Sequence, residues 1–425
     1  MIEVRKMTYA EKAIQAIENH LLDEARENID LSIQKDTEMD QVQLAEILFS
    51  KGFIQDAKKM YEYLLTIPEF AEEAKIRIAE IFIEEGADTA ALDILLEVPK
   101  ESPHYVEALL VLADLYQTQG LYEVSRQKLQ EASMILPNEP VIHFALGELL
   151  FEIGQYPAAL SEYEKLSKAG LNEFAGINLK FRIAESNSLI GRWDKAEELY
   201  LQILEKKGSP EIYFQLGLTY VQKENYESAI KYLTQLKDID SYFTSLYPVL
   251  IKAHEELGQL DEALLVLEEG LANDQTNPAL YVVGAKLHQK KNHGDQAVRL
   301  LQEALLIDPR NDEARLLLSD IMEQQDDLEN AIEILDEDDM DANPMGDWRK
   351  ATVYEELEEF EEAGKLYKKA APFLSDNEEF INDYIFYLRD EGNWEELESV
   401  FSKAKSQNVL SDETREFIES FIRKE

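Results

Sequence analysis

The chain has 425 residues, of which 45% are hydrophobic and 30% are charged, and its 87 acidic and 42 basic side chains give a formal net charge of −45. A surface of this sign repels phosphate backbones and anionic lipid headgroups, which argues against nucleic acid and membrane surfaces as partners. The absence of cysteine excludes disulfide scaffolds, thiolate metal sites and cysteine nucleophiles, and it fits a reducing compartment.

The start of the sequence gives no sign of export. Residues 1–7 read MIEVRKM, without an apolar stretch behind the basic residues, and nowhere do 18 apolar residues follow one another. We therefore expect a cytoplasmic protein without membrane insertion. Its apolar content is sufficient for a long core, which excludes a disordered chain.

One short pattern recurs along the whole chain. It consists of a turn, an aromatic or aliphatic residue, two mostly polar residues and a small anchor residue, as in GQYPAA at 154–159. The anchors are Ala25, Ala57, Ala91, Ser125, Ala159, Ala196, Ala229, Ala263, Ala297, Ala331, Ala363 and Leu397. Their spacings are 32, 34, 34, 34, 37, 33, 34, 34, 34, 32 and 34 residues. This period predicts stacked helical repeats instead of two or three globular domains.

Each repeat is expected to contain two helices, A and B. A second small residue stands twelve positions before most anchors, as at Ala45 and Ala79, and allows the two helices to approach closely. Four positions after the anchor, residues such as Tyr61 and Tyr163 continue the apolar stripe of helix B and are expected in the core. Prolines such as Pro137 recur where one repeat ends, because proline cannot continue the preceding helix.

These small, aromatic and proline positions resemble those of the tetratricopeptide repeat family, over roughly residues 7 to 408. Within that family, the chain is similar to the acidic, repeat-only YpiA-type proteins of Gram-positive bacteria. The resemblance implies an all-α fold, a right-handed superhelical solenoid of about twelve helix-turn-helix repeats without β-sheet. It also implies protein–protein interaction as the function.

Irregular spacings suggest a division of the chain. The spacing of 37 before Ala196 places three extra residues in segment 169–178, which predicts a longer turn and a change of superhelical direction. We expect N-terminal repeats 1–5 at 7–168, repeats 6–12 at 169–408, and a capping helix at 411–425 that begins at Ser411. The cap would present an apolar stripe made of Phe417, Ile418, Phe421 and Ile422.

Motifs for catalysis or metal binding are not found. The six histidines are scattered, and the sequence lacks a His-Glu-x-x-His pair, a phosphate-binding glycine loop and a Gly-x-Ser-x-Gly turn. Asp339, Asp341 and Asn343 alternate like calcium ligands, but Pro344 replaces the required glycine and Lys350 the final glutamate. We therefore expect no enzymatic activity, no cofactor and no metal site.

In tetratricopeptide repeat proteins, helix A lines the concave surface through repeat positions 2, 5, 9, 12 and 13. With the anchor as position 20, position 9 gives an acidic ladder: Glu46, Glu80, Asp114, Glu148 and Glu185. Position 5 gives an apolar ladder: Val42, Ile76, Leu110, Phe144, Phe181 and, one repeat later, Phe214. Carboxylates steer a partner while buried apolar contacts supply most of the affinity, so these ladders predict binding of a basic, partly apolar client segment. The alternative is that the acids form only a solvated face.

Further along, position 9 becomes Leu218, Lys252 and Lys286, with Lys290 at position 13. This differently charged sector would hold a second partner or another part of the same one. Relatives that dock chaperone tails use lysine at position 5 and asparagine at position 9, and this sequence has neither. Docking of acidic chaperone tails is therefore disfavoured.

The leading hypothesis is a scaffold or adaptor that delivers clients to another machine, for example for regulated proteolysis. The alternative is a regulator that senses short signalling peptides, which would require an output domain. Since repeats extend from about Met7 to near Gln407, we expect no room for one in this sequence. An unrecognised enzyme is the third possibility, and the sequence predicts neither the client nor the oligomeric state.

Overall fold

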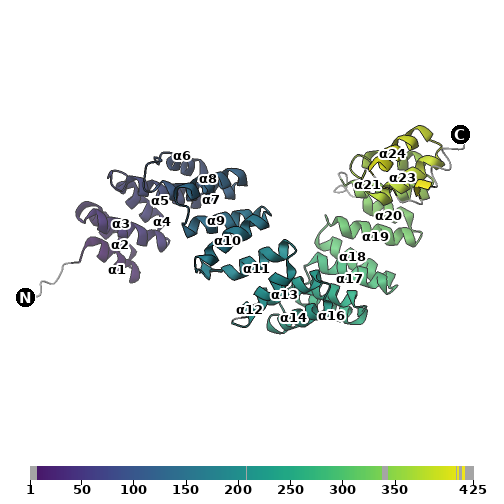
Figure 1. The fold of residues 1–425 in the computed structure, drawn as a ribbon, viewed down its shortest axis with the longest axis horizontal. Helices are drawn as coiled ribbons and strands as arrows, with labels where there is room; N and C mark the ends of the chain where they lie inside the picture. Colours follow the sequence, from purple (N-terminus) through teal and green to yellow (C-terminus); the bar gives the residue numbers. More distant parts are fainter. Residues whose placement is uncertain (1–6, 207, 337–342, 408, 411–413, 417–425) are drawn as a thin grey trace, which may run out of the picture. The chain divides into compact units, whose positions relative to one another are not determined.

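The structure is a computed structural model that describes residues 7–206, 208–336, 343–407, 409–410 and 414–416. The chain forms two compact units, unit 1 at Met1–Lys207 and unit 2 at Gly208–Glu425 (Figure 1). The predicted domain division after residue 168 stays a prediction. The predicted capping helix lies outside the described residues except for 414–416.

Unit 1 is built from paired helices, each odd-numbered helix packing against the even-numbered helix that follows it (Figure 1). The helices are α1 (Tyr9–Glu18), α2 (Leu22–Lys35), α3 (Glu38–Ser50), α4 (Ile54–Leu64), α5 (Ala71–Glu84), α6 (Asp88–Leu96), α7 (Tyr105–Thr118), α8 (Tyr122–Ile135), α9 (Pro140–Glu152), α10 (Tyr156–Lys168), α11 (Leu179–Leu189) and α12 (Trp193–Leu204). Odd-numbered helices are the predicted A helices and even-numbered helices the predicted B helices. Neighbouring A helices also touch, as α5 does α7 and α7 does α9.

Unit 2 repeats the same arrangement. Its helices are α13 (Pro210–Gln222), α14 (Tyr226–Ile239), α15 (Leu246–Glu256), α16 (Leu260–Asn273), α17 (Pro278–Lys290), α18 (Gly294–Ile307), α19 (Asp312–Gln324), α20 (Leu328–Leu335), α21 (Pro344–Glu356), α22 (Phe360–Ala370), α23 (Glu378–Asp390) and α24 (Trp394–Gln407). The A helices α13, α15 and α17 touch in succession, as do α19, α21 and α23. The predicted all-α fold of helix pairs is thereby confirmed.

The packing of each pair follows from the small residues. The anchors Ala57 and Ala159 are completely buried, and so is the B-helix tyrosine Tyr163, which belongs to the same core cluster as Ala159. Gly147 on α9 lies so close to Tyr163 that a Cβ atom there would stand 2.6 Å from Cε1. Helices A and B approach this closely because the crossing residue carries no side chain.

Turns between paired helices require a residue with positive φ. Gly154 has a φ of 74° at the end of α9, a conformation that glycine adopts without a steric cost. In repeats without glycine at this position, non-glycine residues take the same conformation, as Glu224 does with a φ of 55°. Local sequence signals also fix helix starts, since Thr8 and Asn178 accept hydrogen bonds at the first turns of α1 and α11.

The longer spacing before α11 contains a small β-hairpin, so the expectation of a fold without β-sheet is wrong at this point. Strands β1 (Glu173–Phe174) and β2 (Ile177–Asn178) pair antiparallel. Ala175 and Gly176 between them have φ angles of 49° and 78°, which is the conformation of a two-residue hairpin turn. The three extra residues therefore form a paired turn that packs on α11.

The structure also bears on two other expectations, that the segment around Asp339, Asp341 and Asn343 is not a calcium site and that the chain does not insert into a membrane. Residues 337–342 lie outside the described part, but Asn343 accepts hydrogen bonds from the Met345 and Gly346 amides and thereby caps α21. Lys350 is buried and pairs with Asp336 at 3.0 Å. Within the described ranges, no group of three or more metal-ligating side chains occurs, and no helix is long and apolar enough to span a bilayer.

Candidate protein-binding surface on the A helices

The five members of the acidic ladder stand on successive A helices of unit 1, but their surroundings differ. Glu46 on α3 and Asp114 on α7 are exposed. Glu80 on α5, Glu148 on α9 and Glu185 on α11 are partly buried. The predicted ladder is therefore divided into exposed and enclosed carboxylates, and the enclosed ones are held by arginines.

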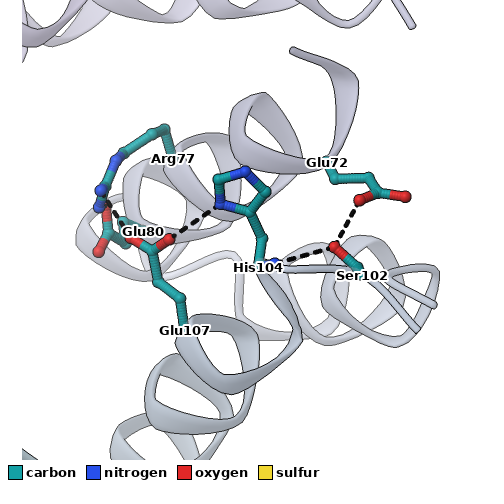
Figure 2. A network of polar contacts seen from close by, with 6 residues as sticks. All are labelled: Glu72, Arg77, Glu80, Ser102, His104 and Glu107. Carbon is teal, nitrogen blue, oxygen red and sulfur yellow. Dashed lines mark hydrogen bonds and ion pairs between the residues drawn. The ribbon is translucent and has the colours of Figure 1, made fainter. Parts of the chain in front are cut away.

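Arg77 on α5 is the first of these arginines (Figure 2). It donates to Glu80 at 2.8 Å on its own helix and to Glu107 at 2.6 Å on α7, which ties two neighbouring A helices together. His104 Nδ1 lies 3.5 Å from the other oxygen of Glu107. Burial alone would lower the pKa of Arg77, but the hydrogen bond and charges of its two carboxylates raise it above the ordinary value.

Arg182 on α11 forms the second link. Its guanidinium donates to Glu148 on α9 at 2.7 Å and to Glu185 on α11 at 2.9 Å. The Tyr163 hydroxyl donates to the same Glu148 at 2.6 Å. Against the opposing effect of burial, the two carboxylates raise the pKa of Arg182. Two members of the acidic ladder are therefore engaged within the protein.

The sequence analysis missed these arginines because it considered only the columns known to face the groove. Arg77, Arg182 and Arg349 all stand at position 6 of their repeats. Arg349 forms an ion pair with Asp320 at 2.8 Å, and Asp320 is a position 9 acid of unit 2. An arginine three positions before a position 9 acid, or in the next repeat, is the sequence signal for an enclosed carboxylate.

The apolar ladder is more enclosed than expected. Ile76 is completely buried, which corrects its assignment to the binding surface, because its side chain belongs to the core between α5 and α7. Val42 and Leu110 are partly buried, Val42 on the core formed by α1 to α5 and Leu110 on the core formed by α7 to α9. Phe144 lies 5.0 Å from the ring of Phe174 in the hairpin.

The remaining members show the same partial burial. Phe181 lies 5.8 Å from the ring of Tyr200, edge to face. In unit 2, Phe214 on α13 lies 5.0 Å from the ring of Phe243, and it packs on the core around α15. Each of these rings therefore already has an aromatic neighbour.

The lysine sector lies on α15 and α17 of unit 2. Lys252 is exposed. Lys286 pairs with Glu313 at 2.5 Å, and Lys290 pairs with Glu255. Two of the three predicted cations are thus partly neutralised by neighbouring repeats.

A pocket that the sequence analysis did not predict lies among α19, α21, α22 and α23. Its volume is about 400 Å³, and its lining consists of Glu323, Arg349, Thr352, Glu355, Glu356, Tyr367, Asp383 and Phe386. Burial raises the pKa of Glu323, Glu355 and Asp383. The signal was present as acids at positions 6, 12 and 13 of successive repeats, but these columns were not compared along the chain.

Helix pairs of this kind, with small residues at most crossings, are those of a tetratricopeptide repeat protein. Models of YpiA-like tetratricopeptide repeats match residues 117–171, and models of the YpiA-like C-terminal repeats match 344–407. General tetratricopeptide repeat models match 210–242 and 289–348. TPR repeat-containing protein YpiA of Bacillus subtilis strain 168 is 32% identical over 413 residues, which are 97% of each chain. The chain belongs to the YpiA-like family of tetratricopeptide repeat proteins, as predicted.

More distant similarities were also found. BBSome complex member BBS4 of Bos taurus is 24% identical over 210 residues, which are 48% of this chain and 39% of that protein. A crystal structure of a tetratricopeptide repeat protein from Parabacteroides merdae has a TM-score of 0.48 at 17% identity, over 59% of this chain and 98% of that one.

Proposed function

We propose that this protein is a non-enzymatic cytoplasmic scaffold or adaptor that binds a basic, partly apolar segment of client proteins on the A helices of unit 1. Tetratricopeptide repeat proteins are generally interaction scaffolds that bind peptides or other proteins. One observation carries the finer proposal: the exposed acids Glu46 and Asp114 stand on the same helices as the partly buried apolar residues Val42 and Leu110.

The arrangement suits such a client for two physical reasons. Residues four apart on a helix lie on one face, so each exposed acid has an apolar neighbour one turn away. The acids attract a basic segment over about 8 Å at physiological ionic strength, and apolar contacts then slow its release. The enclosed acids contribute less to this attraction, because they are partly buried and Arg77 and Arg182 offset part of their charge.

The adaptor part of the proposal rests on the presence of differently charged surfaces in the two units. Unit 1 presents the exposed acids, whereas unit 2 presents Lys252 and the acidic pocket around Glu355. Two such surfaces suit two partners, for example a client and a machine for regulated proteolysis.

A peptide array tests the proposal. Immobilised peptides with graded numbers of arginine or lysine and of leucine or phenylalanine are probed with the full chain at several salt concentrations. We expect binding to require both residue classes and to weaken with salt, and the double variant Glu46→Gln, Asp114→Asn to bind less. Equal binding to peptides in which glutamate replaces the basic residues would refute the proposal.

A further inference from the structure

The most informative feature of unit 1 is a set of three side chains that occurs twice in the same repeat columns. The set consists of a tyrosine at position 24, a glutamate at position 9 and an arginine at position 6 of the next repeat. In one copy, Tyr163 donates to one oxygen of Glu148 at 2.6 Å, and Arg182 donates to the other oxygen at 2.7 Å. Both oxygens of the carboxylate are satisfied, and the tyrosine is completely buried with its hydroxyl paired.

In the other copy, the same three columns hold Tyr61, Glu46 and Arg77. Here the arginine donates instead to Glu80 on its own helix and to Glu107 on α7, as Figure 2 shows. Glu46 is exposed, and among the described residues it forms neither a hydrogen bond nor an ion pair. Tyr61 is only 2% exposed, and its hydroxyl is buried without a hydrogen-bond partner. We call this copy open, because its glutamate pairs with neither the tyrosine nor the arginine, and we call the Tyr163 copy closed.

The electrostatic surroundings of the open copy indicate what is missing. Four charged groups lie within electrostatic range of the Tyr61 hydroxyl: Arg77, Glu46, Glu73 and Glu80. The single cation among them is already held by Glu80 on its own helix and by a second carboxylate on α7. Because Arg77 already pairs with Glu80, the charges of Glu46 and Glu73 are left to act on a buried, unpaired hydroxyl, and a second cation would balance them.

An exposed glutamate needs a nearby cation before it can move inward to a buried hydroxyl, because the carboxylate loses water in doing so. Bringing the Glu46 carboxylate inward removes water from a charge in a region that is already negative, which is unfavourable. In the closed copy, the guanidinium of Arg182 offsets this cost beside Glu148. A cation supplied from outside would do the same for Glu46.

We infer that Glu46 and the Tyr61 hydroxyl form a receptor for the guanidinium of an arginine side chain on a client segment. The guanidinium takes the place that Arg182 has in the closed copy, so that Glu46 accepts from both the ligand and Tyr61. This inference rests on the proposed function and names one contact within it. A planar guanidinium fits better than an ammonium because its fixed, forked N–H donors match the geometry of a carboxylate.

The neighbouring residue on α3 defines the rest of the contact. Val42 lies one helical turn before Glu46 and is partly buried on the edge of the core. It offers an apolar contact to the residue beside the bound arginine. The expected client motif is therefore an arginine next to a leucine-like residue.

Direct binding measurements test the receptor. The probes are two acetylated and amidated peptides in which leucines alternate with either arginine or its neutral isostere citrulline, titrated into the full chain by calorimetry. We expect the arginine peptide to bind at least tenfold more tightly than the citrulline peptide. Glu46→Gln should weaken the arginine peptide about tenfold and Tyr61→Phe about threefold, with little effect on the citrulline peptide.

The closed copy supplies matched controls. Glu148→Gln and Tyr163→Phe remove the same groups from the same columns, and each should change the affinity for the arginine peptide by less than about twofold. Equal losses in the two copies, or none with Glu46→Gln and Tyr61→Phe, would overturn the receptor. If the peptide still binds and only Asp114→Asn weakens it, the proposed function survives and this site is wrong. If the parent chain binds neither peptide, both fail.

A second experiment uses the competition between the client's arginine and Arg77. Glu107→Gln removes one carboxylate that holds Arg77, so Arg77 is freed to close the site over Glu46. We expect the affinity for the arginine peptide to fall at least threefold, and Arg77→Met in the same chain to restore it. Glu101→Gln removes one exposed charge from the turn before α7 and controls for the change in net charge. Equal affinity in Glu107→Gln and Glu101→Gln would contradict the proposed competition.

Discussion

Gly147 of α9 lies directly against the ring of Tyr163 of α10, and a Cβ atom on this glycine would stand 2.6 Å from Cε1. The two residues occupy the small position of helix A and the aromatic position of helix B, so this contact sets how closely the pair packs. Neither residue has room to move, since Tyr163 is completely buried and its hydroxyl is held by Glu148.

Gly147→Ala should therefore destabilise the protein, although alanine favours helices more than glycine does. Overpacking of a buried contact costs about 1–3 kcal/mol, which exceeds the gain of about 1 kcal/mol from helix propensity. Urea denaturation measures the change. Gly294→Ala is the matched control, because its nearest neighbour would be a flexible Gln325 side-chain nitrogen at 3.4 Å. A loss of stability in the control as large as in Gly147→Ala would contradict this account.

The paired and unpaired tyrosines predict opposite effects of removing a hydroxyl. Tyr163→Phe should lower the free energy of unfolding by about 1–3 kcal/mol, because Glu148 loses a donor. Tyr61→Phe should leave it unchanged or raise it slightly, because this buried hydroxyl has no partner. Denaturant unfolding of the two variants side by side provides the comparison. Equal destabilisation would show that the Tyr61 hydroxyl is paired in solution.

Turns between helices give a third prediction. Glu224 has a φ of 55° at the position where Gly154 has a φ of 74° in an earlier repeat. The positive φ costs a non-glycine residue about 1–2 kcal/mol, which glycine avoids. Glycine also has more conformational freedom in the unfolded chain, and this offsets part of the gain in stability. Glu224→Gly should therefore stabilise the chain by about 0.5–1 kcal/mol. The reciprocal change, Gly154→Ala, should destabilise it by a similar amount in the same thermal or urea unfolding experiment.

The acidic pocket of unit 2 predicts that the stability of the protein depends on pH. Burial raises the pKa of Asp383, assisted by Glu379 and opposed by Trp348 and Arg349. In the unfolded state this carboxyl has an ordinary pKa of about 4, so between about pH 4 and its raised folded-state pKa the folded protein binds more protons than the unfolded protein. The contribution of Asp383 to stability therefore falls as the pH rises through this window. Its cost is fully present at neutral pH.

Asp383→Asn removes the charge and keeps an acceptor for the Trp348 indole, which donates to Asp383 at 3.0 Å. The variant should be more stable than the parent at pH 7 by up to about 1 kcal/mol, and the difference should shrink as the pH falls towards about 4. Unfolding curves at several pH values measure it. The exposed acid Glu398 provides the control, and a similar pH-dependent gain in Glu398→Gln would contradict a local cause.

Much of the fold was predictable because the sequence of each repeat contains the local signals for its own helices and turn. A small residue such as Ala159, a B-helix tyrosine such as Tyr163 and a turn glycine such as Gly154 each have one local role, and the period of about 34 residues repeats those roles. The hairpin at β1 and β2 was not predicted. Its two-residue strands are too short for a periodic signal, and only Gly176 marks its turn.

The binding surface was harder to predict. The repeat position of a residue indicates which way its side chain points, but it does not indicate which neighbouring side chains already pair with it. Glu46 and Glu148 share position 9, yet one is exposed and the other accepts from Tyr163 and Arg182. Ile76 shares position 5 with Val42 but is completely buried. These differences come from residues in neighbouring repeats, which a comparison within one column does not include.

The last prediction concerns the kinetics of client capture and uses this division of the acidic ladder. The exposed pair Glu46 and Asp114 should steer a basic client, whereas Glu148 and Glu185 are partly buried and share the guanidinium of Arg182, which offsets one of their two charges. The double variant Glu46→Gln, Asp114→Asn should therefore slow association about three- to tenfold at low salt and flatten its dependence on ionic strength. Stopped-flow measurements with a fluorescent arginine- and leucine-containing peptide report both quantities.

Its counterpart is the double variant Glu148→Gln, Glu185→Gln, which removes the same formal charge from enclosed positions. Association should slow less than with the exposed pair, because these two carboxylates are partly buried beside Arg182 and steering depends mainly on exposed charge. The counterpart should instead lower stability, since a half-buried arginine then lacks its charged acceptors. If both double variants slowed association equally, client capture would depend on total charge and not on where the structure exposes it.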